Sequence, residues 1–211
     1  MDNNNLQINS KQLIHWFNAL RNLPEDERTR ALEAFWAGQL DSKCWLVNTL
    51  NDYVTKTSNI YIFGGWIGVL SSMLFQCTKF EVSNIRSIDM DPWCESIADT
   101  VCYPYTIDNG RFKAITADMC QFNYDWDIYP DIVINTSTEH VDQATYDIWY
   151  DRIPAGSLVL IQGNNFFDWS EHVRCSNSLV DFKRMNHVTK PLYNGELKHD
   201  IYTRYMCIFN K

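Results

Sequence analysis

The sequence predicts an α/β protein in which a mostly parallel sheet is covered by helices on both faces and preceded by further helices. Two observations predict this. Strand-like and helical segments alternate from residue 59 onward, and no strand pattern precedes that residue. Such alternation makes consecutive strands parallel, because each helix carries the chain back across the sheet. The 211 residues suffice for one domain with a full core.

Residues 1–57 read as helices, and we expect them to form a cap or lid over the ends of the strands. A second helix should begin at Pro24, which is followed by three acids that favour a helix start, and end near Gly38. The first helix, expected over residues 11–20 after the cap residue Ser10, shows an apolar stripe that predicts its buried face. The stripe consists of Leu13, Ile14, Phe17 and Leu20.

From residue 59 the segments follow in order. Strands are expected at 59–63, 84–89, 112–116, 131–135, 156–162, 190–197 and 202–210, and helices at 68–77, 91–102, 142–153 and 170–184. No helix separates the last two strands, so they should form an antiparallel hairpin at or near the edge of the sheet.

The charge and cysteine content narrow the classes of function and location. With 18 Lys and Arg against 26 Asp and Glu, the net charge of -8 argues against duplex nucleic acid as a partner and favours a small molecule or peptide. No apolar run is long enough for a membrane span, and the polar N-terminus differs from a signal peptide. The seven cysteines are scattered without C-x-x-C spacing, which indicates reduced thiols and a cytoplasmic location. The oligomeric state stays open.

A glycine-rich turn links the first strand to its helix. Gly64, Gly65 and Gly68 occupy the segment "FGGWIG", where a parallel sheet usually binds its ligand. Glycines there allow a ligand to approach the backbone, and the following helix offers free N–H groups. The alternative is that the turn only helps the helix to pack on its strand.

Acids follow the second strand. Asp89 is placed to bind the two hydroxyls of a ribose, and Asp91 to cap the helix that begins at Pro92. In the alternative interpretation, both acids serve only the helix start.

At this point the chain resembles the class I methyltransferases that use S-adenosyl-L-methionine (SAM). The order of a glycine turn, an acid after strand two, Asp118 with Met119 after strand three, and a loop after strand four carries the resemblance over residues 58–210. A weaker similarity, in "GGWIG" and "NTSTEH", is to methyltransferase-like proteins of phages. The nicotinamide dehydrogenases fit less well, because the glycine spacing is not G-x-G-x-x-G.

The resemblance implies a Rossmann-like domain over residues 58–211, with a seven-stranded sheet whose C-terminal strand is antiparallel. It also implies SAM as cofactor and methyl transfer as the reaction. The implied cofactor-binding residues are Phe63, Gly64, Gly65, Trp66, Gly68, Asp89, Met90, Asp118, Met119 and Asn135.

Two departures from the family pattern keep alternatives open. Ile62 stands where the family usually has an acid, and Trp66 replaces the middle glycine. Another SAM reaction, such as transfer of the aminocarboxypropyl arm or SAM cleavage, and an inactive SAM-binding protein therefore stay open.

The acceptor is expected beside the loop after the fourth strand. Asn135, Glu139 and His140 are the candidate catalytic residues, with His140 as base and Glu139 fixing its position. The alternative is that Glu139 and His140 only start the next helix.

Beyond the fifth strand, Asn164, Asn165 and Phe166 are candidates for binding the acceptor, or are simply turn and core residues. Glu171 and His172 repeat the Glu-His pair. Together with Glu139 and His140 these residues could converge on a metal, which stays an alternative. Nothing in their spacing requires a metal, so none is expected.

Overall fold

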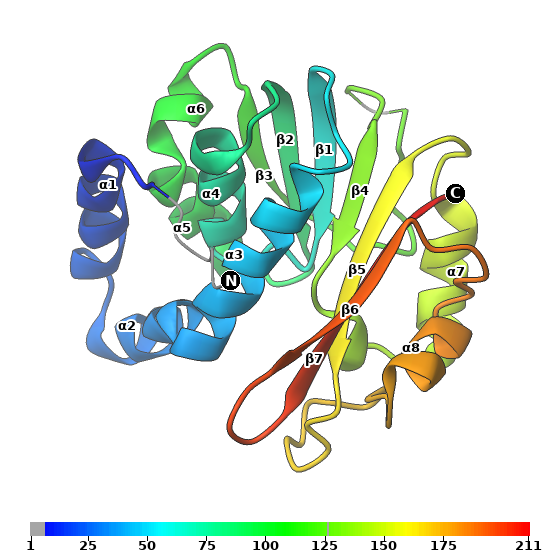
Figure 1. The fold of residues 1–211 in the computed structure, drawn as a ribbon. Coiled ribbons are helices and arrows are strands. Elements are labelled where there is room, and N and C mark those ends of the chain that lie inside the picture. Colours follow the sequence, from blue (N-terminus) through cyan, green and yellow to red (C-terminus); the bar gives the residue numbers. More distant parts are fainter. Residues whose placement is uncertain (1–6, 126) are drawn as a thin grey trace.

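The computed structural model describes residues 7–125 and 127–211. Its sheet has seven strands in the order β3-β2-β1-β4-β5-β7-β6 (Figure 1). Strands β1 to β5 are parallel, whereas β7 lies antiparallel between β5 and β6. The strands are β1 (Ser58–Phe63), β2 (Val82–Asp89), β3 (Phe112–Thr116), β4 (Ile132–Asn135), β5 (Leu158–Asn164), β6 (Tyr193–Lys198) and β7 (Thr203–Asn210). The predicted fold class and the C-terminal hairpin are confirmed.

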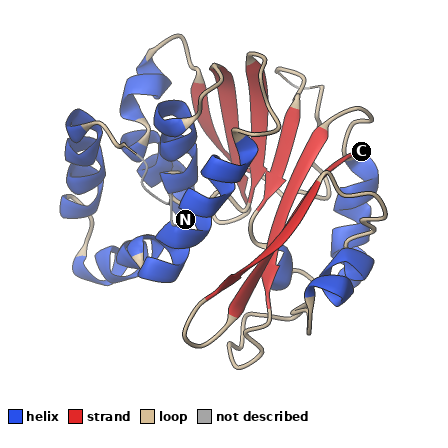
Figure 2. Cartoon of the chain, in the orientation of Figure 1, coloured by secondary structure: helices blue, strands red, loops and turns tan. Residues whose placement is uncertain are grey.

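Helices cover both faces of this sheet, as Figure 2 shows. On one side lie α1 (Ser10–Arg21), α2 (Glu25–Leu32), α3 (Ala37–Leu50), α4 (Val69–Cys77), α5 (Trp93–Val101) and α6 (Tyr103–Ile107) (Figure 1). On the other lie α7 (Gln143–Arg152) and α8 (Leu179–Met185). Two short 3-10 turns, Glu33–Phe35 and Thr138–His140, complete the described elements. Within the described ranges, no helix combines the length and apolar character that crossing a membrane requires.

The core consists of two apolar layers, one on each face of the sheet. Strand β1 supplies both, because side chains alternate along a strand. Ile60 and Ile62 pack into the layer under α3, α4 and α5, whereas Tyr61 and Phe63 pack into the layer that contains Trp149 of α7. A strand buried on both faces needs a continuous apolar run, which "IYIF" provides.

Helix α1 buries a different face from the predicted one. Leu13, Ile14 and Phe17 of the predicted stripe are exposed. The buried face instead carries Gln12, Trp16 and Ala19. Two hydrogen bonds fix this orientation: Trp16 Nε1 donates to Ser72 Oγ at 3.0 Å, and Gln12 Nε2 donates to the Val101 carbonyl at 2.6 Å.

The second helix ends before Gly38, so that prediction was wrong. The chain turns at Trp36, whose carbonyl accepts hydrogen bonds from the next helix, and Gly38 lies in the first turn of α3. A Cβ at Gly38 would lie 2.5 Å from Tyr202 Oη. The glycine therefore allows the loop between β6 and β7 to approach α3 rather than ending a helix.

The helix expected over residues 170–184 is also shorter than predicted. Ser178 caps it, so that only Leu179–Met185 is helical. The preceding residues bind neighbouring loops: the N–H groups of Val173 and Arg174 both donate to the Glu139 carbonyl. These tertiary hydrogen bonds satisfy backbone groups that a helix would have used internally.

The polar start of the chain, from which we expected no signal peptide, includes residues 1–6, which lie outside the described residues.

Candidate functional site

A cleft of about 1400 Å³ lies at the carboxyl ends of the parallel strands. The turn after β1, the end of β2 and the loops after β3, β4 and β5 all line it. Several residues between 33 and 43, from the 3-10 turn before α3 and from the first turns of α3, line it as well. Ligand pockets usually measure about 300–1,000 Å³. The cleft is therefore large enough for two ligands side by side.

The glycine turn after β1 is shaped by its contacts with neighbouring elements. Gly64 has φ +66°, and a Cβ there would lie 2.6 Å from Ser137 Oγ, in the loop after β4. Gly68 has φ +78° and begins α4 directly against Ala98 of α5. Close packing against the loop after β4 and against α5 thus accounts for these two glycines. Gly64 and Gly65 also line the cleft, so the turn contributes to the site as well.

Trp66 adopts the left-handed backbone conformation that glycine favours, with φ 49°. Bulky residues rarely do so, because the Cβ crowds the backbone. The side chain of Asp89 stabilises the turn, since its Oδ2 accepts a hydrogen bond from the Trp66 N–H at 2.9 Å. Trp66 itself lines the cleft. The sequence pattern of the class I methyltransferases, which the chain resembles, has a glycine at this position.

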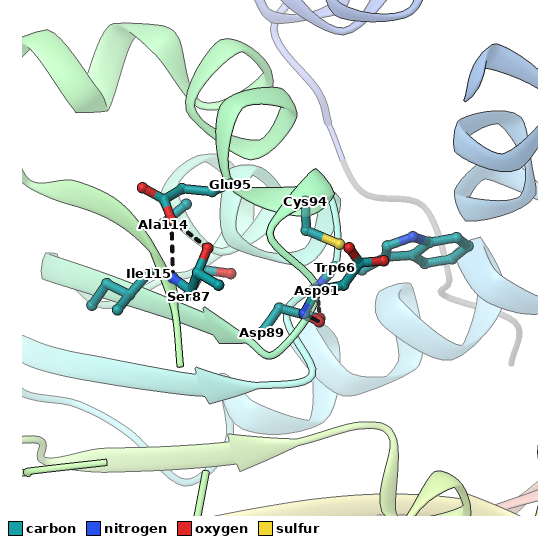
Figure 3. A pocket seen from close by; sticks show the side chains of 9 residues that line it. Trp66, Ser87, Asp89, Asp91, Cys94, Glu95, Ala114 and Ile115 are labelled. Atoms are coloured by element: carbon teal, nitrogen blue, oxygen red, sulfur yellow. Dashed lines mark hydrogen bonds between the residues drawn. The ribbon is translucent and has the colours of Figure 1, made fainter. Parts of the chain in front are cut away.

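Asp89, the last residue of β2, and Asp91, two residues later, have different partners (Figure 3). Asp89 accepts N–H groups from Trp66 and Asp91, one on each oxygen. Asp91 Oδ1 accepts the N–H of Trp93 at the start of α5, and Oδ2 pairs with Arg30 of α2 at 2.5 Å. The hydrogen bond from Arg30 holds the pKa of Asp91 below its ordinary value. Asp91 therefore caps α5, and Asp89 reaches the cleft with acceptor capacity left on both oxygens.

The loop after β3 supplies Asp118 and Met119 to the same cleft. Asp118 Oδ1 accepts the N–H of Cys120 at 2.8 Å, which fixes the turn. The sulfur of Met119 lies 3.9 Å from Asn135 Nδ2, so the loop after β3 reaches the end of β4. Met90, after β2, is 77% exposed and also faces the cleft.

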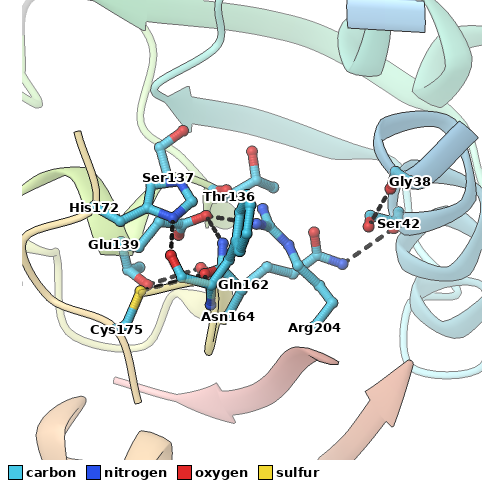
Figure 4. A network of polar contacts seen from close by, with 12 residues as sticks. Gly38, Ser42, Thr136, Ser137, Glu139, Gln162, Asn164, His172, Cys175 and Arg204 are labelled. Atoms are coloured by element: carbon cyan, nitrogen blue, oxygen red, sulfur yellow. Dashed lines mark hydrogen bonds and ion pairs between the residues drawn. The ribbon is translucent and has the colours of Figure 1, made fainter. Parts of the chain in front are cut away.

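Glu139 binds Arg204 rather than His140. Its Oε1 lies 2.5 Å from Arg204 Nη1 and accepts Asn164 Nδ2 at 2.6 Å (Figure 4). Arg204 also donates to the carbonyl of Thr136. Glu139 is only 2% exposed, and among the described residues its Oε2 has no hydrogen-bond partner.

The two histidines of the Glu-His pairs lie together. The rings of His140 and His172 are 4.7 Å apart and perpendicular. His172 Nδ1 lies 2.9 Å from the carbonyl oxygen of Phe166. His140 opens to the cleft, and burial lowers its pKa below the ordinary value of 6.5.

The candidate acceptor residues after β5 bind mostly to protein. Asn164 Oδ1 accepts the N–H of Phe166 at 2.9 Å, and Asn165 Oδ1 accepts the N–H of Thr203 at 2.7 Å. Both amides therefore fix turns. Phe166 lines the cleft and stacks on Tyr202 at 5.8 Å, so it offers an apolar wall. Asn135, which is 2% exposed, likewise fixes its loop by accepting the N–H of Ser137 at 2.9 Å.

Two basic residues of the cleft were not predicted from the sequence. Arg204 directly precedes the apolar run "YMCIF" of β7, and a charge beside such a run was the available signal. Lys43 of α3 donates to Gln39 Oε1 at 2.8 Å, and burial lowers its pKa to about 7. No sequence pattern distinguishes Lys43, since its place in the cleft depends on how α3 packs.

Comparisons with known proteins identify the architecture. No family model and no curated protein matches the chain. Among solved structures, the N-methyltransferase NodS from Bradyrhizobium japonicum WM9, in complex with S-adenosyl-L-homocysteine, is similar with a TM-score of 0.66 over 93% of this chain and 98% of NodS, at 12% identity. The chain has the fold of the class I SAM-dependent methyltransferases.

A second structure of this fold is magnesium protoporphyrin IX methyltransferase (ChlM) from Synechocystis PCC 6803, with bound S-adenosyl-L-homocysteine. It is similar with a TM-score of 0.64 at 11% identity, over 95% of this chain and 94% of ChlM. The resemblance expected from the sequence is thus confirmed at the level of the fold. The roles of the individual site residues remain predictions.

Proposed function

We propose that this protein binds SAM and transfers its methyl group to a small-molecule or peptide acceptor in the same cleft. The observation that carries the proposal is the convergence of Gly64, Asp89 and Asp118, from the ends of β1, β2 and β3, on one cleft. The solved NodS and ChlM structures, which share this fold, hold S-adenosyl-L-homocysteine, the product that SAM leaves after methyl transfer.

In this proposal Asp89 binds the ribose of SAM. Each carboxylate oxygen accepts one backbone N–H in the structure. A carboxylate oxygen has about two lone-pair sites, so each retains one for a ribose hydroxyl. Asp118 and Met119 flank the adenine, and Trp66 covers the cofactor where most members of the fold have a glycine.

The acceptor then lies toward His140 and Phe166. Methyl transfer requires a nucleophile about 3 Å from the methyl carbon and in line with its bond to sulfur. The acceptor's lone pair forms the new bond to carbon, the carbon–sulfur bond breaks toward sulfur, and the acceptor loses a proton. His140 opens to the cleft on this side, so we assign it to the acceptor and not to the cofactor.

Calorimetric titration with SAM, S-adenosyl-L-homocysteine and NAD tests cofactor choice. We expect the first two to bind and NAD to bind much more weakly; equal or stronger NAD binding would contradict the proposal. Incubation with SAM and cell extract then identifies the reaction. Formation of S-adenosyl-L-homocysteine supports methyl transfer, whereas methylthioadenosine indicates a different SAM reaction, and no turnover indicates a binding protein.

A further inference from the structure

Three side chains of the types that bind metals meet on the acceptor side of the cleft. Glu139 and His140 follow β4, and His172 lies in the loop after β5. One ligand atom from each of the three lies within 4.8 Å of the others. The folded loops therefore bring the two Glu-His segments together, although no sequence spacing requires it.

The carboxylate of Glu139 has a buried oxygen that lacks a partner. Its Oε1 is occupied by Arg204 and Asn164, whereas Oε2 has no hydrogen-bond partner among the described residues. The side chain is 2% exposed, so bulk water does not satisfy this atom. A buried polar atom without a partner costs free energy and indicates a missing proton donor, water or ion.

The hydrogen bond of His172 prepares the ring for a cation. A carbonyl oxygen only accepts, so Nδ1, at 2.9 Å from the Phe166 oxygen, carries the proton. In the neutral ring the lone pair is then on Nε2. Metal-binding histidines characteristically donate their other ring N–H to a backbone carbonyl in this way.

We propose that Glu139, His140 and His172 bind one divalent transition-metal ion at the acceptor side of the cleft. Two imidazoles and one carboxylate suit ions such as Mn²⁺, Fe²⁺, Co²⁺ or Zn²⁺ better than Mg²⁺ or Ca²⁺, which prefer oxygen ligands alone. Ligand atoms about 2.1 Å from a tetrahedral ion are about 3.4 Å apart, so ligand atoms that now lie up to 4.8 Å apart need to approach by at most about 1.4 Å.

Arg204 and Asn164 orient the carboxylate that would hold the ion. Both bind Oε1, which leaves Oε2 as the free ligand atom. The positive charge of Arg204 beside Glu139 repels a metal ion bound to the same carboxylate. The two histidines therefore carry much of the affinity for the ion. This arrangement predicts a site for one ion with at least one open coordination position toward the cleft.

The role of the ion rests on the proposed function. An acceptor oxygen or nitrogen bound at an open position becomes more acidic, because the cation stabilises its deprotonated form. The proton leaves to solvent, and the acceptor lone pair then attacks the methyl carbon. With the ion present, His140 acts on the acceptor as a metal ligand.

Mn²⁺ is the appropriate probe, because the chain has seven cysteines that would also bind softer ions. Binding is measured on the chelator-treated full chain from the loss of the electron paramagnetic resonance signal of free Mn²⁺. We expect one ion per chain in the wild type and at least tenfold weaker binding in His140→Ala and in His172→Ala. The matched control is His15→Ala, on α1, which should bind Mn²⁺ like the wild type.

Either of two results would overturn the inference: Mn²⁺ binding that is absent in the wild type, or binding that His172→Ala leaves unchanged. Circular dichroism of each variant shows that it is folded. Both histidines are replaced in preference to Glu139, whose loss would leave Arg204 buried without its partner. SAM affinity, measured on the same ion-free samples, tests the proposed function separately, so that failure of one is distinguished from failure of the other.

Discussion

Arg204 on β7 and Glu139 after β4 form a buried ion pair at 2.5 Å, with side chains that are 7% and 2% exposed. The pair joins the C-terminal hairpin to the loop that lines the acceptor side of the cleft. Arg204 extends the link to the carbonyl of Thr136 in the same loop. The position of His140, the next residue after Glu139, therefore depends on a strand that comes more than sixty residues later.

Replacing Arg204 with Met should destabilise the fold by about 3–5 kcal/mol, because the carboxylate of Glu139 stays buried without its partner. The double variant Glu139→Gln/Arg204→Met should recover much of this loss, since neither charge is then buried alone. Urea unfolding measures both. The control is Arg184→Met, which breaks an exposed pair with Asp181 and should cost less than about 1 kcal/mol. If Arg204→Met were as stable as Arg184→Met, this account would be contradicted.

Much of the fold was predictable from local patterns. The apolar runs of β1, β4 and β5 have the length of buried strands, and segments with helical patterns separate most of the strands, so the sheet follows from their order. The lack of a helix between β6 and β7 predicted the hairpin. Asp89 and Asp118 both line the cleft, because the ends of parallel strands share one edge, and their roles stay predictions.

Features that depend on tertiary contacts were not predictable. The face of α1 is set by hydrogen bonds from Gln12 and Trp16, which the apolar stripe does not reveal. The segment before α8 remains a loop because its N–H groups bind the Glu139 carbonyl. The partner of Glu139 was missed for the same reason, since Arg204 is distant in sequence and adjacent only after folding.

Asp89→Ala should weaken SAM binding by about 1.5–3 kcal/mol, the range for hydrogen bonds to a charged group. Asp91→Ala is the matched control, since its carboxylate caps α5 and pairs with Arg30. It should leave SAM affinity unchanged and lower stability by about 1 kcal/mol through the lost cap. Calorimetry and urea unfolding separate the two effects. If Asp91→Ala weakened SAM binding more than Asp89→Ala, the assigned roles would be reversed.

His140→Ala should reduce formation of S-adenosyl-L-homocysteine by roughly 10²–10⁴-fold, the usual contribution of a group that assists proton removal. Its affinity for SAM should stay near the wild-type value, because the residue faces the acceptor. Turnover is followed with cell extract as the source of acceptor, and SAM binding by calorimetry. His187→Ala is the comparison: His187 pairs with Asp147 on α7. Wild-type turnover by His140→Ala would remove this residue from the mechanism.

Lys43 should make the stability of the fold increase with pH above neutrality. Burial lowers its pKa from 10.5 to about 7, so the folded chain disfavours the charged amine. Between these two values the unfolded chain binds more protons than the folded one, and the free energy of unfolding therefore rises with pH. Lys43→Met, which keeps the length of the side chain without its charge, should lose this increase. Urea unfolding of both proteins across that pH window measures the difference between them. As pH rises, the free energy of unfolding of the wild type should increase relative to that of Lys43→Met. A constant difference between the two would show that Lys43 has an ordinary pKa in the folded protein.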